Sequence, residues 1–188
     1  MEQPFTHSGT RDPAPSPREQ ENAALARQAA AAGVVLLKNR GVLPLNPGAP
    51  VALFGAGAGR TVKGGTGSGD VNNRASVSIW QDLKGAKAAL YVISRIAGEG
   101  KDRRLVPGDY YLSDAQRADL QTLDESGLPV VLLLNAGGPV ELTGLLDGMQ
   151  HLDAILQLSQ LGQQGGQAVA DVLLGRAVPE GKLTATWA

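Results

Sequence analysis

Four apolar runs along the chain each lead into a loop that contains glycine. Each run is short and nearly continuous, the pattern expected of a strand whose two faces are both buried. They occupy residues 50–59, 88–95, 129–139 and 152–166. The pattern therefore predicts four buried strands, each followed by a tight, glycine-containing turn.

Helical patterns lie before and between these runs. Residues 22–39, NAALARQAAAAGVVLLKN, are rich in good helix formers and stop before Gly41, which predicts a first helix. Residues 113–126 begin with a Ser or Asp cap, and residues 165–175 have apolar positions at helical spacing and a terminal glycine. Alternating strands and helices favour right-handed crossovers, so we predict an α/β fold: a three-layer α/β/α sandwich with a mainly parallel sheet.

The first residues differ in composition from the rest of the chain. Residues 1–20 contain four prolines and show no apolar period, so they cannot offset their ordering entropy by burial. We predict a flexible leader over residues 1–21 and one domain over residues 22–188. The leader has no apolar core of the kind found in secretion signals, and a cytoplasmic location is the default expectation.

Composition narrows the choice of partners. With 17 basic and 18 acidic residues the net charge is −1, which offers no general attraction to nucleic acid or to an anionic membrane. There are no cysteines, and His7 and His151 are the only histidines, far apart in sequence. We therefore expect no metal centre, no cofactor, no nucleic-acid partner and no membrane span.

Two glycine-rich loops are candidates for ligand binding. Residues 55–59, GAGAG, follow a strand, but the spacing is not that of a dinucleotide-binding turn, so a tight turn is the preferred interpretation. Residues 63–74, KGGTGSGDVNNR, combine glycines with Lys63, Ser68 and Asp70. These three side chains supply a donor, a hydroxyl and an acceptor, a mixture suited to a polyhydroxylated sugar. A mobile surface loop is the alternative for this segment.

Glu99 is the candidate for catalysis. It stands between two glycines in IAGEGKDRR, residues 96–104, directly after a predicted strand and beside several basic residues. A lone loop glutamate is usually only solvated. The neighbouring cations would favour its ionised form, so a general acid here needs burial or a second carboxylate to raise its pKa. Asp109, in PGDYYLS, is interpreted as a turn residue.

The longer motifs together resemble a known family. ALARQAAAAGVVLLKNRGVLPL, KGGTGSGDVNNR, YVISRIAGEGKDRR, PVVLLLNAGGPVEL and LGQQGGQAVADVLLGRAVPEGKLTATW occur in this order. From about Asn22 to Ala188 the chain is similar to the α/β sandwich domain of family 3 glycoside hydrolases, the β-glucosidase type. The resemblance implies that Glu99 is the general acid/base and that Lys63, Ser68 and Asp70 border the sugar subsite.

The resemblance also implies a partner. In this family the nucleophilic aspartate comes from a TIM barrel, which takes about 250 residues and is not contained in this chain. The expected partners are therefore a β-glycoside or oligosaccharide substrate and a barrel in the same or a separate chain. The stretch between SIWQDL and YVISR is also several tens of residues shorter than is usual in the family. We expect the isolated domain to be inactive.

Two other functions remain open. A domain without its barrel could serve as a non-catalytic carbohydrate-binding or interaction module. A nucleotide binder using Gly55 to Gly59 is the second alternative, and it predicts that a nucleotide protects the chain. The identity of the sugar stays open at this point.

Overall fold

The computed structural model describes residues 14–48, 50–59, 62–64, 87–97, 100 and 103–187. Within this part of the chain, five strands form one sheet in the order β1-β5-β4-β3-β2. The strands are β1 (Val35–Asn39), β2 (Ala52–Phe54), β3 (Ala89–Arg95), β4 (Val130–Ala136) and β5 (Leu152–Gln157). Strands β2 to β5 are parallel, and β1 runs antiparallel to β5 at the edge.

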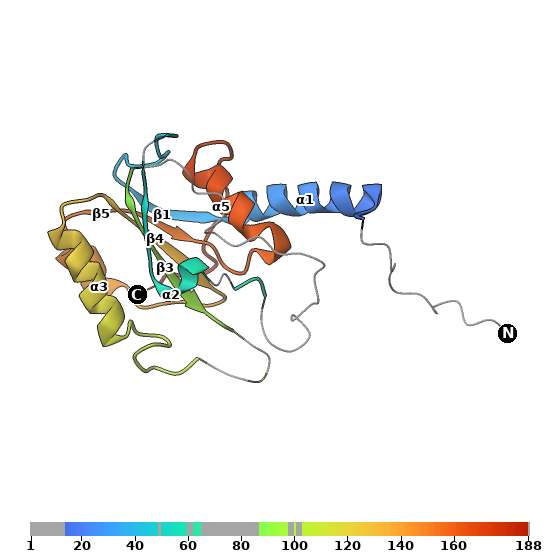
Figure 1. Cartoon of the computed structure of the whole chain (residues 1–188). Coiled ribbons are helices and arrows are strands. Elements are labelled where there is room, and N and C mark those ends of the chain that lie inside the picture. Colours follow the sequence, from blue (N-terminus) through green and yellow to red (C-terminus); the bar gives the residue numbers. More distant parts are fainter. Residues whose placement is uncertain are drawn as a thin grey trace.

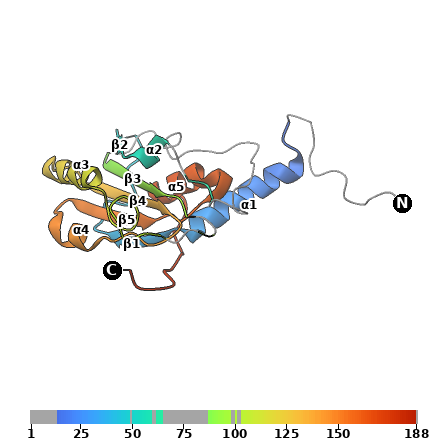
Figure 2. The same cartoon turned by 90° about the horizontal axis from the view of Figure 1, so that it is seen from below.

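Helices cover both faces of this sheet. Figure 1 shows α1 (Pro17–Gly33) and α5 (Gly165–Leu173) on one side and α3 (Asp114–Glu125) on the other, and Figure 2 shows the same layers from below. The short helix α4 (Thr143–Gly148) lies with α3, because Leu145 packs in the same core cluster as Leu120 and Leu123. The predicted three-layer α/β/α sandwich with a mainly parallel sheet is confirmed.

The central strands explain why the apolar runs are continuous. In β3, Leu90 and Val92 belong to the cluster under α1 and α5, whereas Tyr91 and Ile93 belong to the cluster under α3 and α4. Successive side chains of a strand point to opposite faces, so a strand covered on both sides needs apolar residues at every position. All seven residues of β4 are buried for the same reason.

The prediction of one helix over residues 22–39 was wrong at its end. The helix α1 stops at Gly33, and Val35–Asn39 form the edge strand β1 instead. Val34 already has an extended backbone and is fully buried. Adjacent β-branched valines fit a strand better than a helix, and hydrogen bonding to β5 decides between the two.

The same helix begins earlier than predicted. It starts at Pro17, after a capping box in which Ser16 and Glu19 each accept a hydrogen bond from the other's backbone N–H. Proline at the first helical position adds to this start signal. The predicted leader boundary at residue 21 therefore falls inside α1, and residues 1–13 lie outside the described residues.

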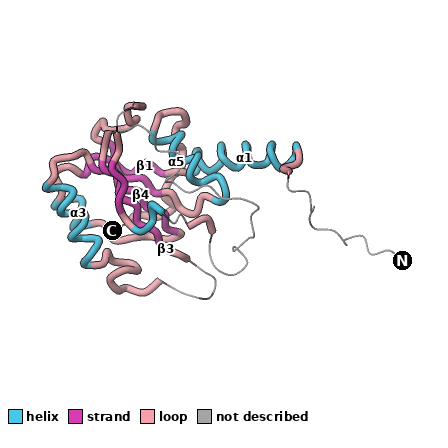
Figure 3. Tube along the Cα trace, viewed as in Figure 1, coloured by secondary structure: helices cyan, strands magenta, loops and turns pink. Residues whose placement is uncertain are grey.

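The other elements follow the predicted segments closely. Helix α3 has a capping box between Ser113 and Gln116, and α5 lies within the predicted segment 165–175. Figure 3 shows the strands as a central layer between helices, joined by long loops. In the described part of the chain, no helix combines the length and apolar character needed to cross a bilayer.

Candidate functional site

The loops that follow β2, β3, β4 and β5 all leave from the same edge of the sheet, because these four strands are parallel. In α/β sheets this carboxyl edge is where ligands bind. The described residues of these loops include residues 62–64 after β2, Ile96 and Ala97 after β3, Gly137 and Gly138 after β4, and residues 158–164 after β5.

Asn135, at the end of β4, connects three of these strand ends. Its side chain is fully buried. Its Oδ1 accepts hydrogen bonds from the Val62 N–H (2.6 Å) and from the Ser94 hydroxyl (3.2 Å). Its Nδ2 donates to the carbonyl oxygens of Val62 (2.9 Å) and Ser159 (2.7 Å). All four hydrogen-bonding positions of one amide are thus used to join strand β3 and two loops that are distant in sequence.

A further bond ties two of these loops directly. The Gly162 N–H donates to the Lys63 carbonyl oxygen at 2.9 Å. Between these contacts Ser159 has a φ of 56°, a left-handed conformation that is unusual for a residue other than glycine. The hydrogen bond from Asn135 to the Ser159 carbonyl helps to hold that conformation. The backbone of Lys63, the first residue of the glycine-rich loop, is therefore fixed from both sides.

The exit from β3 packs against the exit from β4. A Cβ placed on Gly137 would lie 2.9 Å from the Ala97 Cβ and 3.0 Å from the Gln160 Nε2. Only glycine permits this close approach, which brings the start of the loop after β3 against the loop after β4. Gly100, farther along the loop after β3, has a φ of 70° and so also favours glycine.

Asp109 closes the second half of that loop. Its carboxylate accepts from the Arg104 N–H at 2.9 Å and pairs with Arg103, while its carbonyl accepts from Arg95 Nε at 3.1 Å. The hydrogen bond from the Arg104 backbone, followed by that from the Arg103 side chain, lowers the pKa of Asp109 below its ordinary value. Burial and the charge of Arg103 lower the pKa of Arg95. The expected turn role of Asp109 is confirmed. Its carboxylate and carbonyl also hold Arg95, Arg103 and Arg104 close together at this edge.

The four predicted site residues stand as follows. Lys63 is half-buried at the carboxyl edge, where Val62 and Gly162 hold its backbone. Ser68, Asp70 and Glu99 lie outside the described residues. Their roles remain predictions.

Asn135 was missed by the sequence reasoning although a signal was present. It is the one amide in the otherwise apolar run VVLLLNA, at the strand end where ligands bind in this class of sheet. A buried polar group must find partners, so such an amide indicates a hydrogen-bonding network. The sequence shows the amide but cannot show which loops it joins.

The GAGAG segment has a packing role. Residues Ala56–Gly59 form the one-turn helix α2, which lies against β3. A Cβ on Gly55 would collide with the Val92 carbonyl oxygen, and one on Gly57 would collide with the Ser94 hydroxyl. This close approach accounts for the two glycines, in agreement with the preferred interpretation as a tight turn.

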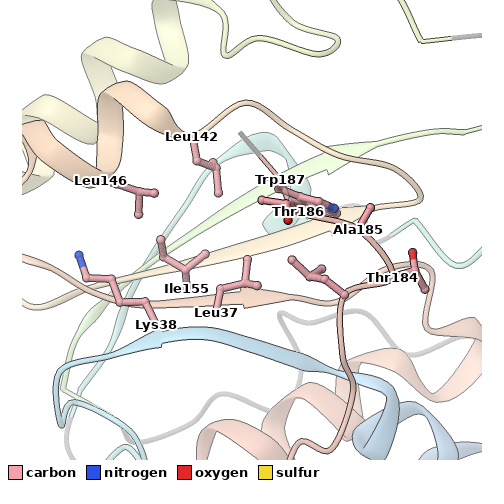
Figure 4. Close-up of a pocket in the computed structure, with 10 residues that line it drawn as sticks. Leu37, Lys38, Leu142, Leu146, Ile155, Thr184, Ala185, Thr186 and Trp187 are labelled. Carbon is pink, nitrogen blue, oxygen red and sulfur yellow. The ribbon is translucent and has the colours of Figure 1, made fainter.

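A cavity of about 590 Å³ lies elsewhere in the molecule. Figure 4 shows Leu142 and Leu146 above Ile155 and Leu37, with Trp187 on one side and Lys38 at the opposite end. None of its lining residues belongs to the loops that Asn135 joins. The cavity and the carboxyl edge are therefore separate features, and the convergence of loops carries the stronger functional argument.

No metal site is found in the part of the chain that the structure describes. His151 precedes β5, and its N–H donates to the Asp124 Oδ1 at 2.6 Å. This contact lies at the amino end of β5, opposite the carboxyl edge.

A nearly parallel sheet between two helical layers, with polar and glycine-rich loops at its carboxyl edge, defines an α/β sandwich. Residues 34–188 match the protein family described as "Glycosyl hydrolase family 3 C-terminal domain". The chain belongs to glycosyl hydrolase family 3, of which it is the C-terminal domain, the type found in β-glucosidases and β-xylosidases.

Individual relatives agree with this assignment. The chain is 30% identical to β-glucosidase A of Butyrivibrio fibrisolvens over 90% of its own length and 29% of that protein. It is 30% identical to a probable exo-1,4-β-xylosidase of Neosartorya fischeri over 98% of its own length and 27% of that protein. Among solved structures, β-glucosidase 3B of Thermotoga neapolitana in complex with glucose has a TM-score of 0.85 and 36% identity, covering 92% of this chain and 32% of that one.

The lengths of these matches show how much of its relatives the chain covers and where it is shorter. The chain spans about 22–32% of the relatives it matches. The match to the Butyrivibrio protein also runs over 240 aligned positions, more than the 188 residues of this chain. That relative therefore contains insertions within the matched region, as expected if the present domain is internally shortened.

Proposed function

We propose that this chain forms one half of the active site of a retaining β-glycoside hydrolase, with Glu99 as the general acid/base. The observation that carries the proposal is the junction at Asn135. This junction holds Lys63, at the start of the glycine-rich loop, beside the strand end from which the Glu99 loop departs. The described starts of the two segments that the sequence singled out, Lys63 and Ile96, thus follow strands that end at one edge.

The chemistry requires two carboxylates. In a retaining glycosidase one carboxylate attacks the anomeric carbon, and the other, about 5 to 5.5 Å away, protonates the leaving oxygen and later deprotonates water. Glu99 takes the second role, and the nucleophilic aspartate comes from a TIM barrel in the same or a separate chain. The approach of that second carboxylate would favour the protonated form of Glu99 that a general acid needs.

The proposed substrates are β-linked glucosides or xylosides. Relatives of this chain are named β-glucosidases and exo-1,4-β-xylosidases, and one solved relative holds glucose. Lys63, Ser68 and Asp70 would provide the donor, the hydroxyl and the acceptor for sugar hydroxyls. No cofactor is needed for this chemistry.

The first experiment measures hydrolysis of an aryl β-glucoside by the purified chain beside its Glu99→Gln variant. Neither protein should turn over substrate, because the nucleophile is supplied by the barrel. If the chain releases the aryl group and the variant does not, the chain carries a complete active site, and the proposal that it needs a barrel is wrong.

A second experiment supplies the barrel. Residues 34–188 would replace the matching domain of the Thermotoga neapolitana β-glucosidase, and Glu99→Gln would be compared with Glu125→Gln, an exposed glutamate at the end of α3. Loss of general acid catalysis should cost about 10²- to 10⁴-fold in rate. The loss should be smaller for an activated aryl leaving group, and azide should partly restore turnover of Glu99→Ala.

The outcomes separate the candidate functions. Equal activity of Glu99→Gln and Glu125→Gln in the hybrid would contradict the acid/base role. A hybrid that binds glucose but shows no turnover with either variant or with the parent chain would favour the non-catalytic carbohydrate-binding module.

A further inference from the structure

We infer that Asn135 is a positioning residue of the sugar subsite: it sets the place of Lys63 through its hydrogen bonds to both backbone groups of Val62, the residue before it. This inference rests on the proposed function, because it assigns Asn135 a task within the same site. Asn135 would not touch the sugar, since its side chain is fully buried and all four of its hydrogen-bonding positions are occupied.

The geometry couples Asn135 to the glycine-rich loop in two ways. Both the N–H and the C=O of Val62 bond to the Asn135 amide, so the residue before Lys63 is held at two points. The same amide holds the Ser159 carbonyl, and three residues later the Gly162 N–H bonds to the Lys63 carbonyl. Loss of the amide would remove the bonds to Val62 and to the Ser159 carbonyl, which lie on the two sides of the Lys63 backbone.

The neighbouring strands explain why an amide is suited to this position. Asn135 and Ser94 are register partners on β4 and β3, so Asn135 lies at the level where both strands reach the carboxyl edge. Each residue of a backbone segment that crosses this edge, such as Val62, presents one N–H donor and one C=O acceptor. Asparagine can pair with both and still reach a second loop, whereas a hydroxyl or a carboxylate cannot supply two donors.

A matched control residue lies on the next strand. Gln157 of β5 is also a buried amide, but its Nε2 donates to the Ala136 carbonyl at 2.7 Å and reaches the Ser159 hydroxyl only at 3.5 Å, whereas both backbone groups of Val62 bond to Asn135. Asn135→Leu and Gln157→Met each replace a buried amide by an apolar side chain of similar length. Both would perturb the core, but only Asn135→Leu would remove the bonds to Val62.

The test uses the full chain labelled with ¹⁵N and has two readouts. The first is hydrogen exchange of the Val62 and Gly162 amides, each compared with the Leu132 amide in the centre of β4 to correct for global stability. The second is the dissociation constant for D-glucose, followed through the backbone amide resonance of Lys63. The parent chain is compared with Asn135→Leu, Gln157→Met and Ser94→Ala.

The expected result is a selective effect. In Asn135→Leu, the protection of the Val62 and Gly162 amides from hydrogen exchange should fall at least tenfold relative to that of Leu132. The dissociation constant for glucose should rise at least tenfold. Gln157→Met should change neither, and Ser94→Ala, which removes one of the two bonds to Oδ1, should have a smaller effect. Should Asn135→Leu retain the protection of Val62 and Gly162, or lose no more than Gln157→Met, the positioning role is wrong.

The remaining outcomes keep the two proposals apart. Lost protection with unchanged glucose affinity would mean that Asn135 holds the loop but the loop does not set the subsite, which overturns the inference. If the parent chain shows no glucose binding, the sugar-side role of the loop in this domain fails, while the exchange data still decide whether Asn135 places Lys63.

Discussion

Arg27 of α1 and Asp171 of α5 are 144 residues apart and form a two-point ion pair, with Nε–Oδ2 at 2.5 Å and Nη2–Oδ1 at 2.7 Å. Arg27 also donates to the Gln167 Oε1 at 3.0 Å. A two-point contact between a guanidinium and a carboxylate is stronger and more directional than a single one. This contact fixes α1, which extends away from the sheet in Figure 1, against α5.

We predict that Arg27→Ala lowers the free energy of unfolding by about 1 to 2 kcal/mol, because the pair is only partly exposed and holds two helices together. Arg27→Lys should lose part of this, since lysine keeps the charge but not the planar fork. Urea unfolding followed by circular dichroism measures the change. Arg18→Ala, at an exposed position of α1, should change stability by less than about 0.5 kcal/mol. Equal losses for Arg18→Ala and Arg27→Ala would argue against the ion pair.

Gly55 offers a test of the packing of α2 on β3. Gly55 and Gly48 both have a left-handed φ, 86° and 96°, but only Gly55 has a backbone atom where a Cβ would stand, the Val92 carbonyl oxygen. Gly48→Ala should cost about 1 kcal/mol of backbone strain. Gly55→Ala should cost about 3 kcal/mol or more, because the clash adds to the same strain. Thermal unfolding of both variants gives the comparison, and similar losses would show that the close approach is unimportant.

The Asp109 carboxylate should make the stability of the folded chain sensitive to acid. Its pKa in the folded protein lies below the ordinary value of 3.8, owing to the hydrogen bond from the Arg104 backbone and the contact with Arg103. A depressed carboxyl pKa stabilises the folded state above the unfolded pKa, and this stabilisation is lost as the pH falls through the folded pKa. The stability of the parent chain should therefore fall between neutral pH and about pH 3, and part of that fall should be missing in Asp109→Asn.

Urea unfolding at the two pH values measures this effect. Asp147→Asn, at an exposed position of α4, serves as the control and should leave the acid sensitivity unchanged. An Asp109→Asn variant with the full acid sensitivity of the parent would contradict the role of this carboxylate.

Tyr91 should make the stability of the folded chain sensitive to high pH instead. It is buried, and its hydroxyl donates to the Asp119 Oδ2 at 2.7 Å. Burial, followed by the hydrogen bond to Asp119 and the charge of that carboxylate, raises the pKa of Tyr91 well above its ordinary value of 10.0. A raised pKa means that its stabilisation is complete below pH 10.0 and is lost as the pH rises toward the folded pKa.

The phenolate absorbance of the folded chain should therefore show a late-ionising tyrosine that is absent from Tyr91→Phe. The same variant should lose about 1 kcal/mol of stability at neutral pH, the usual net value of a hydrogen bond. Tyr110→Phe, in the described loop after β3, is the control and should keep the late step. A late step that survives in Tyr91→Phe would assign it to another tyrosine.

Much of the fold follows from local patterns. The runs that became β3, β4 and β5 could be recognised because strands covered on both faces must be apolar at every position. Helix α3 could be placed because its capping box, Ser113 with Gln116, lies within the segment itself. Where the segment after α1 was misassigned, the deciding contacts lay more than a hundred residues away, in the pairing of Leu36 with Leu156.

The candidate site divides in the same way. Glu99, Lys63, Ser68 and Asp70 were predicted from residue type, flanking glycines and family resemblance, all of which are properties of the sequence. Asn135 was not found, because a buried amide gains its meaning only from the partners that folding brings to it. Those partners, Val62, Ser94 and Ser159, come from three separate parts of the chain.

The sequence alone thus determined the layers of the sandwich, the family and the loops that carry candidate chemistry, because periodicity, caps and motifs are written in neighbouring residues. The tertiary structure decided that residues 35–39 form an edge strand and that one amide on β4 gathers the loops of the carboxyl edge. The physical reason is common to both. Backbone and amide groups must find hydrogen-bond partners when they are buried, and the available partners are set by the whole fold.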